Sequence, residues 1–385
     1  MTLLLYMVGD ANRRGYVRLL EGFWDECRSF DIQLPTEEAV SGAAFCQARS
    51  KLANTFLRSV VHQVADSHER KFAHLSRWRG HRVLAIDGSK VNVQRSDELR
   101  RHFGVPAGGH CPQILVSTLI NVTSEVPCDV VVAPHASSER ELFMQHLDRL
   151  GPSDVLLLDR GYPSFEILQT LKERDIDFVI RVPKAHTFGA VDTFLASGGT
   201  DYRLLIEPPA GGKPGSMPIE VRAVRTSSPD EETIVILTSL RRCNITTEQV
   251  LELYRMRWRI EETYKAIKSR YLDQHQLHAK NRHGVVQEVL ALILFVAISR
   301  FLTAAASVEH DVPIDEVSLK GAILSLAAYV TRIVLCRDPE LANRWLAALL
   351  LRIARAREKR RRGRSFPRRS FKPSPRWGSA GRRGG

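Results

Sequence analysis

The sequence contains few cysteines, and they are not arranged in pairs. There are six of them, scattered along the chain without a C-x-x-C motif: Cys27, Cys46, Cys111, Cys128, Cys243 and Cys336. This spacing argues against a disulfide framework and against a cysteine-based zinc site, and it is typical of a reducing compartment. We therefore expect a cytoplasmic protein.

The sequence also lacks a long apolar run. The most lipid-like stretch, VLALILFVAI at residues 289–298, has ten residues, with Glu288 before it and Arg300 shortly after it. A helix that spans a bilayer needs about 20 apolar residues. At the N-terminus the apolar block precedes the charges, which is the reverse of a secretory signal. We expect residues 289–298 to form a buried core helix and the protein to have no membrane partner.

The body of the protein lacks net charge. The chain has 385 residues and a net charge of +13, and the residues from Arg352 onward hold fourteen Lys or Arg and one Glu. Residues 1–351 are therefore neutral in total. The basic tail is also rich in Gly, Pro and Ser, a composition typical of disordered segments. It is either simply solvated or a tether for a polyanion such as nucleic acid.

The hydrophobic patterning changes several times along the chain. It is first helical, then strand-rich with two helical interruptions, then a series of short strands between turn signals, and finally helical again. Strands in a meander that then alternate with helices predict an α/β fold with a mixed sheet and helices on its faces. The expected regions are residues 1–77, 78–184, 185–245, 246–310, 311–357 and the tail at 358–385.

Two aspartates follow apolar strand patterns. Asp87 comes directly after RVLAI and precedes Gly88, and Asp159 comes after VLLL in the stretch VLLLDRGY. Asp-Gly is a favoured hairpin turn, so Asp87 could be only a turn residue. Asp159 could likewise be only a turn residue that ends its strand. The carboxyl ends of neighbouring strands are, however, where α/β folds place their sites. If the two strands are neighbours, these aspartates could hold a divalent metal.

A further candidate lies in the basic stretch YRMRWRIEETYKAIKSRY at residues 254–271. At about 100° per residue, four side chains fall within an arc of about 60° on one helix: Tyr254, Arg257, Glu261 and Lys268. This arc borders an apolar stripe; Lys265 lies just beyond it, and Glu262 points elsewhere. The alternative interpretation of Glu261 is an ordinary surface ion pair with Arg257, one turn earlier.

These residues resemble a signature of the DDE transposases of bacterial insertion sequences. The Y-R-E-K group of that family spaces its Tyr, Arg, Glu and Lys as Y-x(2)-R-x(3)-E-x(6)-K, and the stretch from Tyr254 to Lys268 matches this spacing without a gap. LAIDGSKV around Asp87 and LLLDRGYPS around Asp159 are similar to the two aspartate motifs of the family. AAFCQARSKL resembles a helical segment that commonly precedes the core, so the resemblance covers about residues 36–310.

The resemblance implies an RNase H-like catalytic core that is interrupted by a β-rich insertion and flanked by an N-terminal helical region and C-terminal helices. It also implies that Asp87, Asp159 and Glu261 are catalytic and bind two Mg²⁺ ions, for which Mn²⁺ can substitute. Carboxylate oxygens are ligands that Mg²⁺ prefers, and such ions activate the nucleophile in phosphodiester cleavage. The expected DNA-contacting residues are Tyr254, Arg257, Lys268, Lys265 and Arg160.

The expected function is therefore that of a transposase acting on double-stranded DNA. It would bind the terminal inverted repeats through the N-terminal helical region, cleave at the ends and join the 3′-hydroxyls to target DNA. Because two ends must be brought together, a homodimer on the DNA is implied, in the bacterial cytoplasm and associated with the nucleoid. Two alternatives remain open: a metal-dependent nuclease of the same fold without strand transfer, and an inactive, transposase-derived DNA-binding protein.

Overall fold

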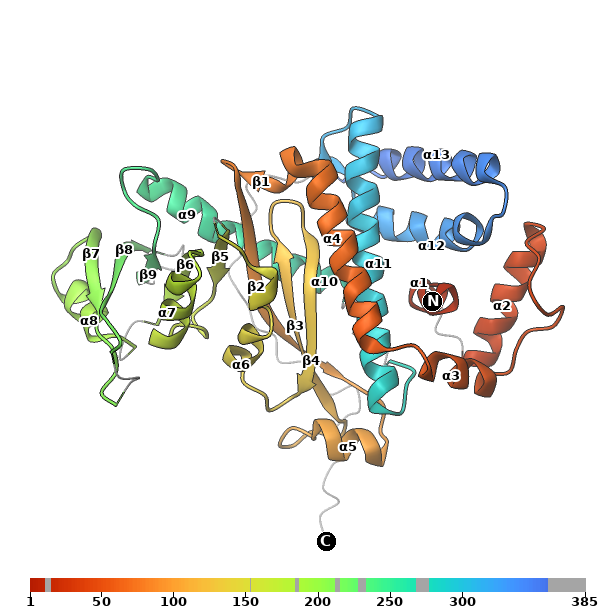
Figure 1. The fold of residues 1–385 in the computed structure, drawn as a ribbon, viewed down its shortest axis with the longest axis horizontal. Coiled ribbons are helices and arrows are strands. Elements are labelled where there is room, and N and C mark those ends of the chain that lie inside the picture. The colour runs from red at the N-terminus through yellow and green to blue at the C-terminus, as the bar shows by residue number, and fades with distance from the viewer. Residues whose placement is uncertain are drawn as a thin grey trace, which may run out of the picture.

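The computed structural model describes residues 1–10, 15–152, 154–183, 187–211, 215–227, 233–267 and 277–358. A mixed β-sheet with helices on both faces adjoins a layer of helices (Figure 1). The strands in chain order are β1 (Arg77–Trp78), β2 (His81–Asn92), β3 (Gln113–Asn121), β4 (Val126–Pro134), β5 (Val155–Leu158), β6 (Asp177–Val182), β7 (Asp201–Ile206), β8 (Ile219–Ser227) and β9 (Thr233–Thr238). Across the sheet they follow the order β4-β3-β2-β5-β6-β9-β8-β7, and β1 pairs with the start of β2.

The first five strands of this order form the RNase H-like core that the sequence predicted. Strands β4, β3 and β2 are an antiparallel meander, and β5 and β6 continue the sheet in parallel with β2. The β-rich insertion supplies β7, β8 and β9, which are antiparallel to one another. Because β9 pairs with β6, with Thr238 opposite Val179, the insertion extends the core sheet instead of forming a separate one.

Helices cover both faces of the sheet because side chains alternate along each strand. In β2, Leu84 and Ile86 belong to one hydrophobic cluster, and Val83 and Ala85 belong to the other. The first cluster includes side chains of α6 (Glu139–Met144), α7 (Phe165–Glu173) and α8 (Gly189–Ala196). The second includes side chains of α9 (Thr247–Met256) and α10 (Trp258–Ile267). Helix α8 lies inside the insertion, for which the patterning predicted only strands.

The other helices form a layer against the β4 side of the sheet (Figure 1). They are α1 (Thr2–Gly9), α2 (Tyr16–Ser29), α3 (Gly42–Ser50), α4 (Asn54–Ser76), α5 (Asp97–Phe103), α11 (Arg282–Glu309), α12 (Leu319–Leu335) and α13 (Pro339–Arg355). Helix α11 packs on α1, α4, α12, α13 and β4. By length and composition α11 could cross a membrane, but 78% of its most apolar window is buried inside the protein. Residues 289–298 therefore form the buried core helix that the sequence predicted.

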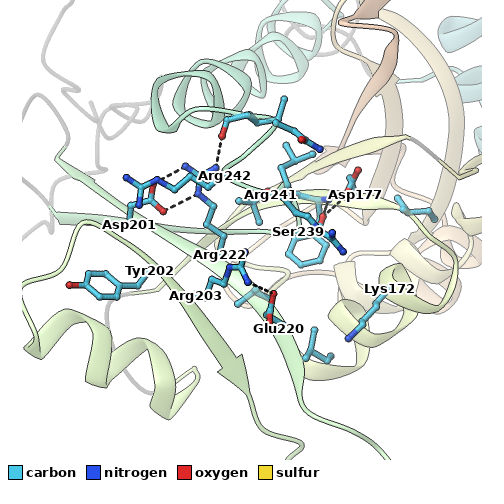
Figure 2. Close-up of a pocket in the computed structure, with 18 of the residues that line it drawn as sticks. Lys172, Asp177, Asp201, Tyr202, Arg203, Glu220, Arg222, Ser239, Arg241 and Arg242 are labelled. Atoms are coloured by element: carbon cyan, nitrogen blue, oxygen red, sulfur yellow. Dashed lines mark hydrogen bonds and ion pairs between the residues drawn. The ribbon is translucent and has the colours of Figure 1, made fainter.

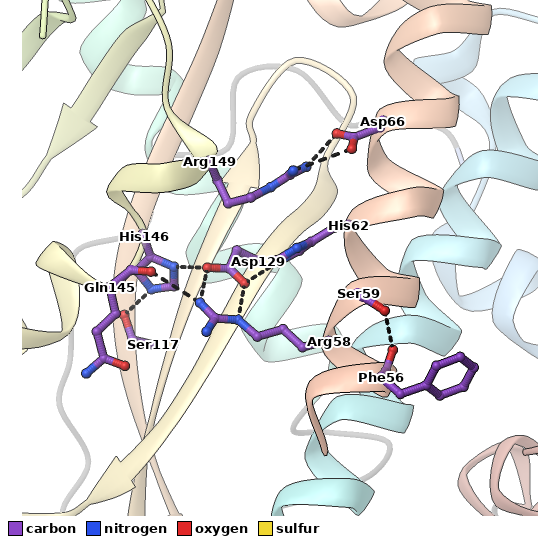
Figure 3. A network of polar contacts seen from close by, with 10 residues as sticks. All are labelled: Phe56, Arg58, Ser59, His62, Asp66, Ser117, Asp129, Gln145, His146 and Arg149. Carbon is purple, nitrogen blue, oxygen red and sulfur yellow. Dashed lines mark hydrogen bonds and ion pairs between the residues drawn. The ribbon is translucent and has the colours of Figure 1, made fainter. Parts of the chain in front are cut away.

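A buried polar network ties this helical layer to the sheet (Figure 3). Asp129 of β4 is fully buried and accepts hydrogen bonds from Arg58 Nε and His62 Nε2 of α4, each at 2.7 Å. On its other side His146 Nδ1 lies 2.7 Å from Asp129, and His146 Nε2 lies 3.0 Å from the Ser117 hydroxyl. The contacts follow the Ser–His–Asp order of a hydrolase triad. Because Ser117 and His146 are also fully buried, a substrate has no access, and the network is structural.

Candidate active site

Asp87 and Asp159 lie at the same level on neighbouring parallel strands. Strands β2 and β5 pair up to Ala85 opposite Leu157, and each aspartate follows two residues later. Because side chains alternate along a strand, both aspartates project from the face that carries Ala85 and Leu157, which is the face covered by α9 and α10. The topology thus brings together two residues that are distant in the sequence.

Strand β2 does not end at Asp87, contrary to the interpretation of the sequence. It continues to Asn92 because this segment pairs with β3, with Asp87 opposite Thr118. The Asp-Gly pair is therefore not a hairpin turn. Only the partner strand stops here, since β5 ends at Leu158. This leaves Asp87 beside the turn that carries Asp159.

The surroundings of Asp87 raise the pKa of its carboxyl group to about 7. Burial is the main cause, because it removes water from the charged form. The charge of Arg257 lowers this pKa, and the carboxylates of Asp159 and Glu139 raise it further. A hydrogen bond from the Gly88 N–H to Asp87 Oδ1, at 3.0 Å, also lowers the pKa. A carboxyl group in these surroundings is stabilised in its ionised form by any added cation.

Tyr264 fixes α10 against the sheet at the level of Asp87. Its hydroxyl lies 3.1 Å from the carbonyl oxygen of Asp87, 3.0 Å from that of Val116 and 2.8 Å from Thr118 Oγ1. The hydroxyl can donate to one of these acceptors at a time, and the Thr118 hydroxyl can donate in return. The ring is buried, so the contact holds the preceding turn of α10, which carries Glu261, close to β2.

Arg257 and Glu261 form an ion pair at the junction between α9 and α10. Arg257 Nη2 donates to Glu261 Oε1 at 2.7 Å. The Arg257 side chain is 7% exposed and that of Glu261 is 29% exposed, so this pair is more buried than the surface pair considered from the sequence. The Arg257 guanidinium lies 5.9 Å from the centre of the Tyr254 ring and 5.6 Å from that of Trp258. The sequence predicted one continuous helix here, whereas α9 ends at Met256 and α10 begins at Trp258. Arg257, at the junction, nevertheless lies beside both Tyr254 and Glu261.

The other predicted residues occupy different positions. Arg160 follows Asp159 directly, and Lys265 lies on α10; both are exposed. Glu262 is also exposed, whereas Glu261 beside it is half-buried. Lys268 lies outside the described residues.

Arg181 also lies at this edge of the sheet, although the sequence did not single it out. It follows Ile180, which pairs with Leu158, so it lies at the level of Asp159 on the next strand. Burial raises the pKa of the Tyr254 hydroxyl, and the charges of Arg257 and Arg181 lower it. In the sequence Arg181 is one basic residue in an apolar strand, and no local signal distinguishes it.

Glu139 is the second residue that the sequence analysis missed. It is the first residue of α6, and its carboxylate lies against the backbone of Gly88 and Gly161. It is therefore close to both aspartates, and their charges affect one another. In the sequence it only begins an ordinary helix, and its proximity to Asp87 depends on how α6 folds back over the sheet.

The donor set suits a divalent cation in its chemistry. The side chains near Asp87 offer carboxylate oxygens, which are the ligands that Mg²⁺ prefers. Among the described residues, however, no three His, Cys, Asp or Glu side chains are close enough together to hold a metal ion. Glu261 is engaged by Arg257. Binding of one ion by three carboxylates would therefore require their side chains to lie closer together than they do here.

A cavity of about 990 Å³ lies at the opposite edge of the sheet (Figure 2). It is lined by the N-terminal end of β6, at Asp177, and by residues of the insertion strands. Its charged groups are largely paired: Arg222 donates to Asp201 at 2.7 and 2.9 Å, and Arg203 lies 3.7 Å from Glu220. The cavity is thus separate from Asp87 on β2 and from Asp159, which follows the C-terminal end of β5.

Comparison with known proteins finds a family model, a sequence relative and a similar structure. The family model of the transposase DDE domain matches residues 78–298. The transposase InsG for insertion sequence element IS4 of Escherichia coli (strain K12) is 26% identical over 283 residues, which cover 70% of this chain and 63% of that relative. A cryo-EM structure of the piggyBac transposase synaptic complex with hairpin DNA is similar with a TM-score of 0.48 and 9% identity, over 91% of this chain and 74% of that one.

The family match includes both aspartates and the helices α9 and α10, and it spans more than half of the chain. The chain covers less than two thirds of the length of the IS4 relative. The matched segment begins at the last residue of β1 and ends within α11, so it contains the strands β2 to β9. The protein therefore belongs to the transposase DDE domain family.

Proposed function

We propose that this protein is a DNA transposase that binds the terminal inverted repeats of an insertion sequence, cleaves at the ends and joins the 3′-hydroxyls to target DNA. The observation that carries the proposal is the pair of Asp87 and Asp159 at one level on adjacent parallel strands, beside α10. Membership of the DDE domain family supports the class of reaction. Phosphoryl transfer of this kind needs oxygen ligands for metal ions and no covalent protein nucleophile.

Asp87, Asp159 and Glu261 would together hold two Mg²⁺ ions. When bound, such ions lower the pKa of the attacking water or hydroxyl and stabilise the leaving oxygen. Mn²⁺ can substitute because it shares the preference for carboxylate oxygens. Arg257 engages only Oε1 of Glu261, so Glu261 would act as a ligand through its other oxygen or after turning away from Arg257; in the second case the guanidinium becomes free to bind a phosphate.

The basic side chains around this edge would hold the DNA backbone beside the reacting phosphate. We assign this role to Arg257, to the exposed Arg160 and Lys265, and to Lys268. Tyr254 would contact the backbone or stack on a displaced base. Phosphate contacts of this kind position the DNA without reading its sequence.

The N-terminal helical region would bind the terminal repeats. Helix α4 packs against α11 and β4, and α1 packs against α11 and α12, so the DNA-binding surface would come from the more peripheral helices α2 and α3. Strand transfer needs two ends, so the protein would act as a homodimer on the DNA. Its partners would be the element ends and the target duplex, in the bacterial cytoplasm at the nucleoid.

The proposal can be tested with purified protein, Mg²⁺, a duplex carrying the DNA that flanks the coding region, and a target plasmid. Pre-cleaved ends should be joined to the plasmid. Asp87→Asn and Glu261→Gln should reduce cleavage and joining by more than about 100-fold, since even outer-shell partners of a metal contribute 10–100-fold. DNA binding should remain near that of the wild type. The control Glu262→Gln should change little, because its side chain is exposed.

The same assay separates the alternatives. Hydrolysis of the ends without joined product would contradict transposition and favour a nuclease. Repeat binding by the wild-type protein without any metal-dependent cleavage would favour an inactive DNA-binding protein. Full activity of Glu261→Gln would show that the assignment of Glu261 as a ligand is wrong.

A further inference from the structure

Exposed basic side chains collect beyond the C-terminal end of β2, away from the residues assigned to the reacting phosphate. After Asn92 the chain leads into α5, and α5 packs against α11. Because residues 1–351 are neutral in total, five cations beside only two exposed acids, Asp97 and Glu98, make this surface locally positive. The five cations, which we call the basic strip, are Arg95, Arg100, Arg101, Lys280 and Arg282.

Specific contacts hold the segments of the basic strip together. The Ser96 hydroxyl donates to the carbonyl oxygen of Lys280 at 2.6 Å, and the Glu98 carboxylate accepts from the backbone N–H of Arg282 at 2.8 Å. Burial lowers the pKa of His102, and the charge of Arg282 lowers it further, which agrees with an Arg282 guanidinium close to α5. The strip is therefore one fixed surface, although its two segments are distant in the sequence.

The cations of the basic strip are not paired within the fold. Among the residues that the structure describes, none of the five side chains forms an ion pair. Other arginines of the sheet do pair with carboxylates, as Arg82 does with Asp154 and Arg222 with Asp201. Like charges that lie close together repel one another, so the strip does not stabilise the fold by itself. Its charges are available to a polyanion.

Helix α3 lies on the other side of the start of α11 from α5. Arg49 of α3 donates from Nη2 to the carbonyl oxygen of Gly284 at 2.9 Å. Residues of α3, of the start of α11 and Gln94 line a common cavity of about 480 Å³. Figure 1 shows α5, the lower end of α11 and α3 following one another along the lower side of the molecule. The basic strip thus connects the strand of Asp87 with a helix to which repeat binding is assigned.

We propose that the basic strip binds the phosphates of the element end, between the reacting phosphate and the part of the repeat that α3 contacts. This inference rests on the proposed function, because it assumes that Asp87 marks the site of cleavage and that α3 belongs to the repeat-binding region. From Asp87 to Asn92 strand β2 covers about 17 Å, at about 3.3 Å per residue. Since phosphates of one DNA strand are about 3.4 Å apart along the duplex, a duplex that follows β2 reaches the strip about five base pairs from the cleaved bond.

The basic strip would position the DNA without reading its sequence. Arg and Lys side chains that contact phosphates carry no sequence information, whereas base reading needs groups that enter a groove. Each phosphate contact releases condensed counterions, so it makes the affinity depend on salt. The contribution of the strip should therefore be the same for all DNA sequences and should weaken as the salt concentration rises.

The test is the salt dependence with which the full chain binds a duplex that carries one end of the element. The triple variant Arg95→Gln, Lys280→Gln and Arg282→Gln should bind about 10-fold or more weakly at low salt. Its slope of log Kd against log salt should fall by about 2–3, because each phosphate contact contributes about 0.9. A matched control should change neither quantity; it replaces by Gln three exposed arginines outside the strip, Arg70, Arg79 and Arg241.

A second measurement locates the contact on the DNA. Methylphosphonate linkages, which carry no charge, replace the phosphates about five to eight base pairs from the cleaved bond. They should weaken binding by the wild type and should not weaken binding by the triple variant further, because both changes remove the same contact. Equal losses in the two proteins would contradict the proposal. Should the triple variant fail to fold, Arg282→Gln alone should lower the salt slope by about 1.

The results separate this inference from the proposed function. If the wild type binds the element end and the triple variant keeps its affinity and salt slope, the strip does not contact this DNA, and the proposed function stands. If the triple variant binds the end normally but captures the target plasmid poorly, the strip serves target DNA and the inference is wrong. If the wild type binds the element end no better than an unrelated duplex, repeat binding is wrong and this inference falls with it.

Discussion

Replacing Asp129 with Asn should destabilise the whole protein, because this carboxylate joins α4 to the sheet. It is fully buried and accepts hydrogen bonds from Arg58 at 2.6 and 2.7 Å, from His62 at 2.7 Å and from His146 at 2.7 Å. An amide removes the negative charge and turns an NH₂ group toward groups that are themselves donors. Leaving one partner of a buried ion pair uncompensated costs about 3–5 kcal/mol.

That cost is large beside the free energy of unfolding of a typical domain, about 5–15 kcal/mol. The assay is urea unfolding at pH 7, followed by circular dichroism, for the wild type, Asp129→Asn and a control. The control is Asp148→Asn, since the side chain of Asp148 is 97% exposed, and it should change the unfolding free energy by less than about 0.5 kcal/mol. A cost below about 1 kcal/mol for Asp129→Asn would refute the reasoning.

The same residue predicts how stability depends on pH. Hydrogen bonds from Arg58, His146 and His62 hold the pKa of Asp129 well below its usual range despite its burial. A carboxyl group whose pKa is lower in the folded state stabilises the fold above its unfolded pKa, about 3.9, and this stabilisation is lost as the pH falls below that value. The wild type should therefore lose stability below about pH 4 more steeply than Asp129→Asn. Parallel curves for the two proteins would contradict this account.

Three further changes have defined outcomes. Gly88→Ala should lower the free energy of unfolding, because its Cβ would lie 2.6 Å from Glu139 Oε1, and the loss should be smaller in a Glu139→Ala background; equal losses in both would contradict the contact. Tyr264→Phe should cost about 1–3 kcal/mol in urea unfolding, because buried acceptors on β2 and β3 lose their donor. Asp201→Asn should cost about 3 kcal/mol, because Arg222, only 5% exposed, loses its ion pair; a change within error would show that this pair is not stabilising.

The sequence predicted the class of fold and the order of its parts. The patterns before Asp87 and Asp159 correctly predicted strands of one mixed sheet, and the strands of the insertion were also recognised. Whether the two strands are neighbours was left open, and the structure decided it. Helix α8 was missed because it is short and lies among turn signals. The end of β2 was misplaced because Asp-Gly resembles a turn, whereas pairing with β3 carries the strand on to Asn92.

For the site, helical phase separated Glu261 from Glu262, because positions four residues apart share a face of any helix. The angular positions of residues around the helix could not show that Arg257 binds the Glu261 carboxylate, because this contact depends on which rotamers the packing of α10 permits. The roles of these residues in metal and DNA binding stay predictions until the assays above are made.

The sequence by itself determined which residues alternate, repeat or share a helical face, because these are local properties of the backbone. Only the tertiary structure decided that Glu139 lies between Gly88 and Gly161 and that Asp129 joins α4 to β4. Such contacts link segments far apart in the chain, and their geometry is set by strand register and by the docking of helices on the sheet. No local pattern encodes that register, so neither contact could be read from the residues alone.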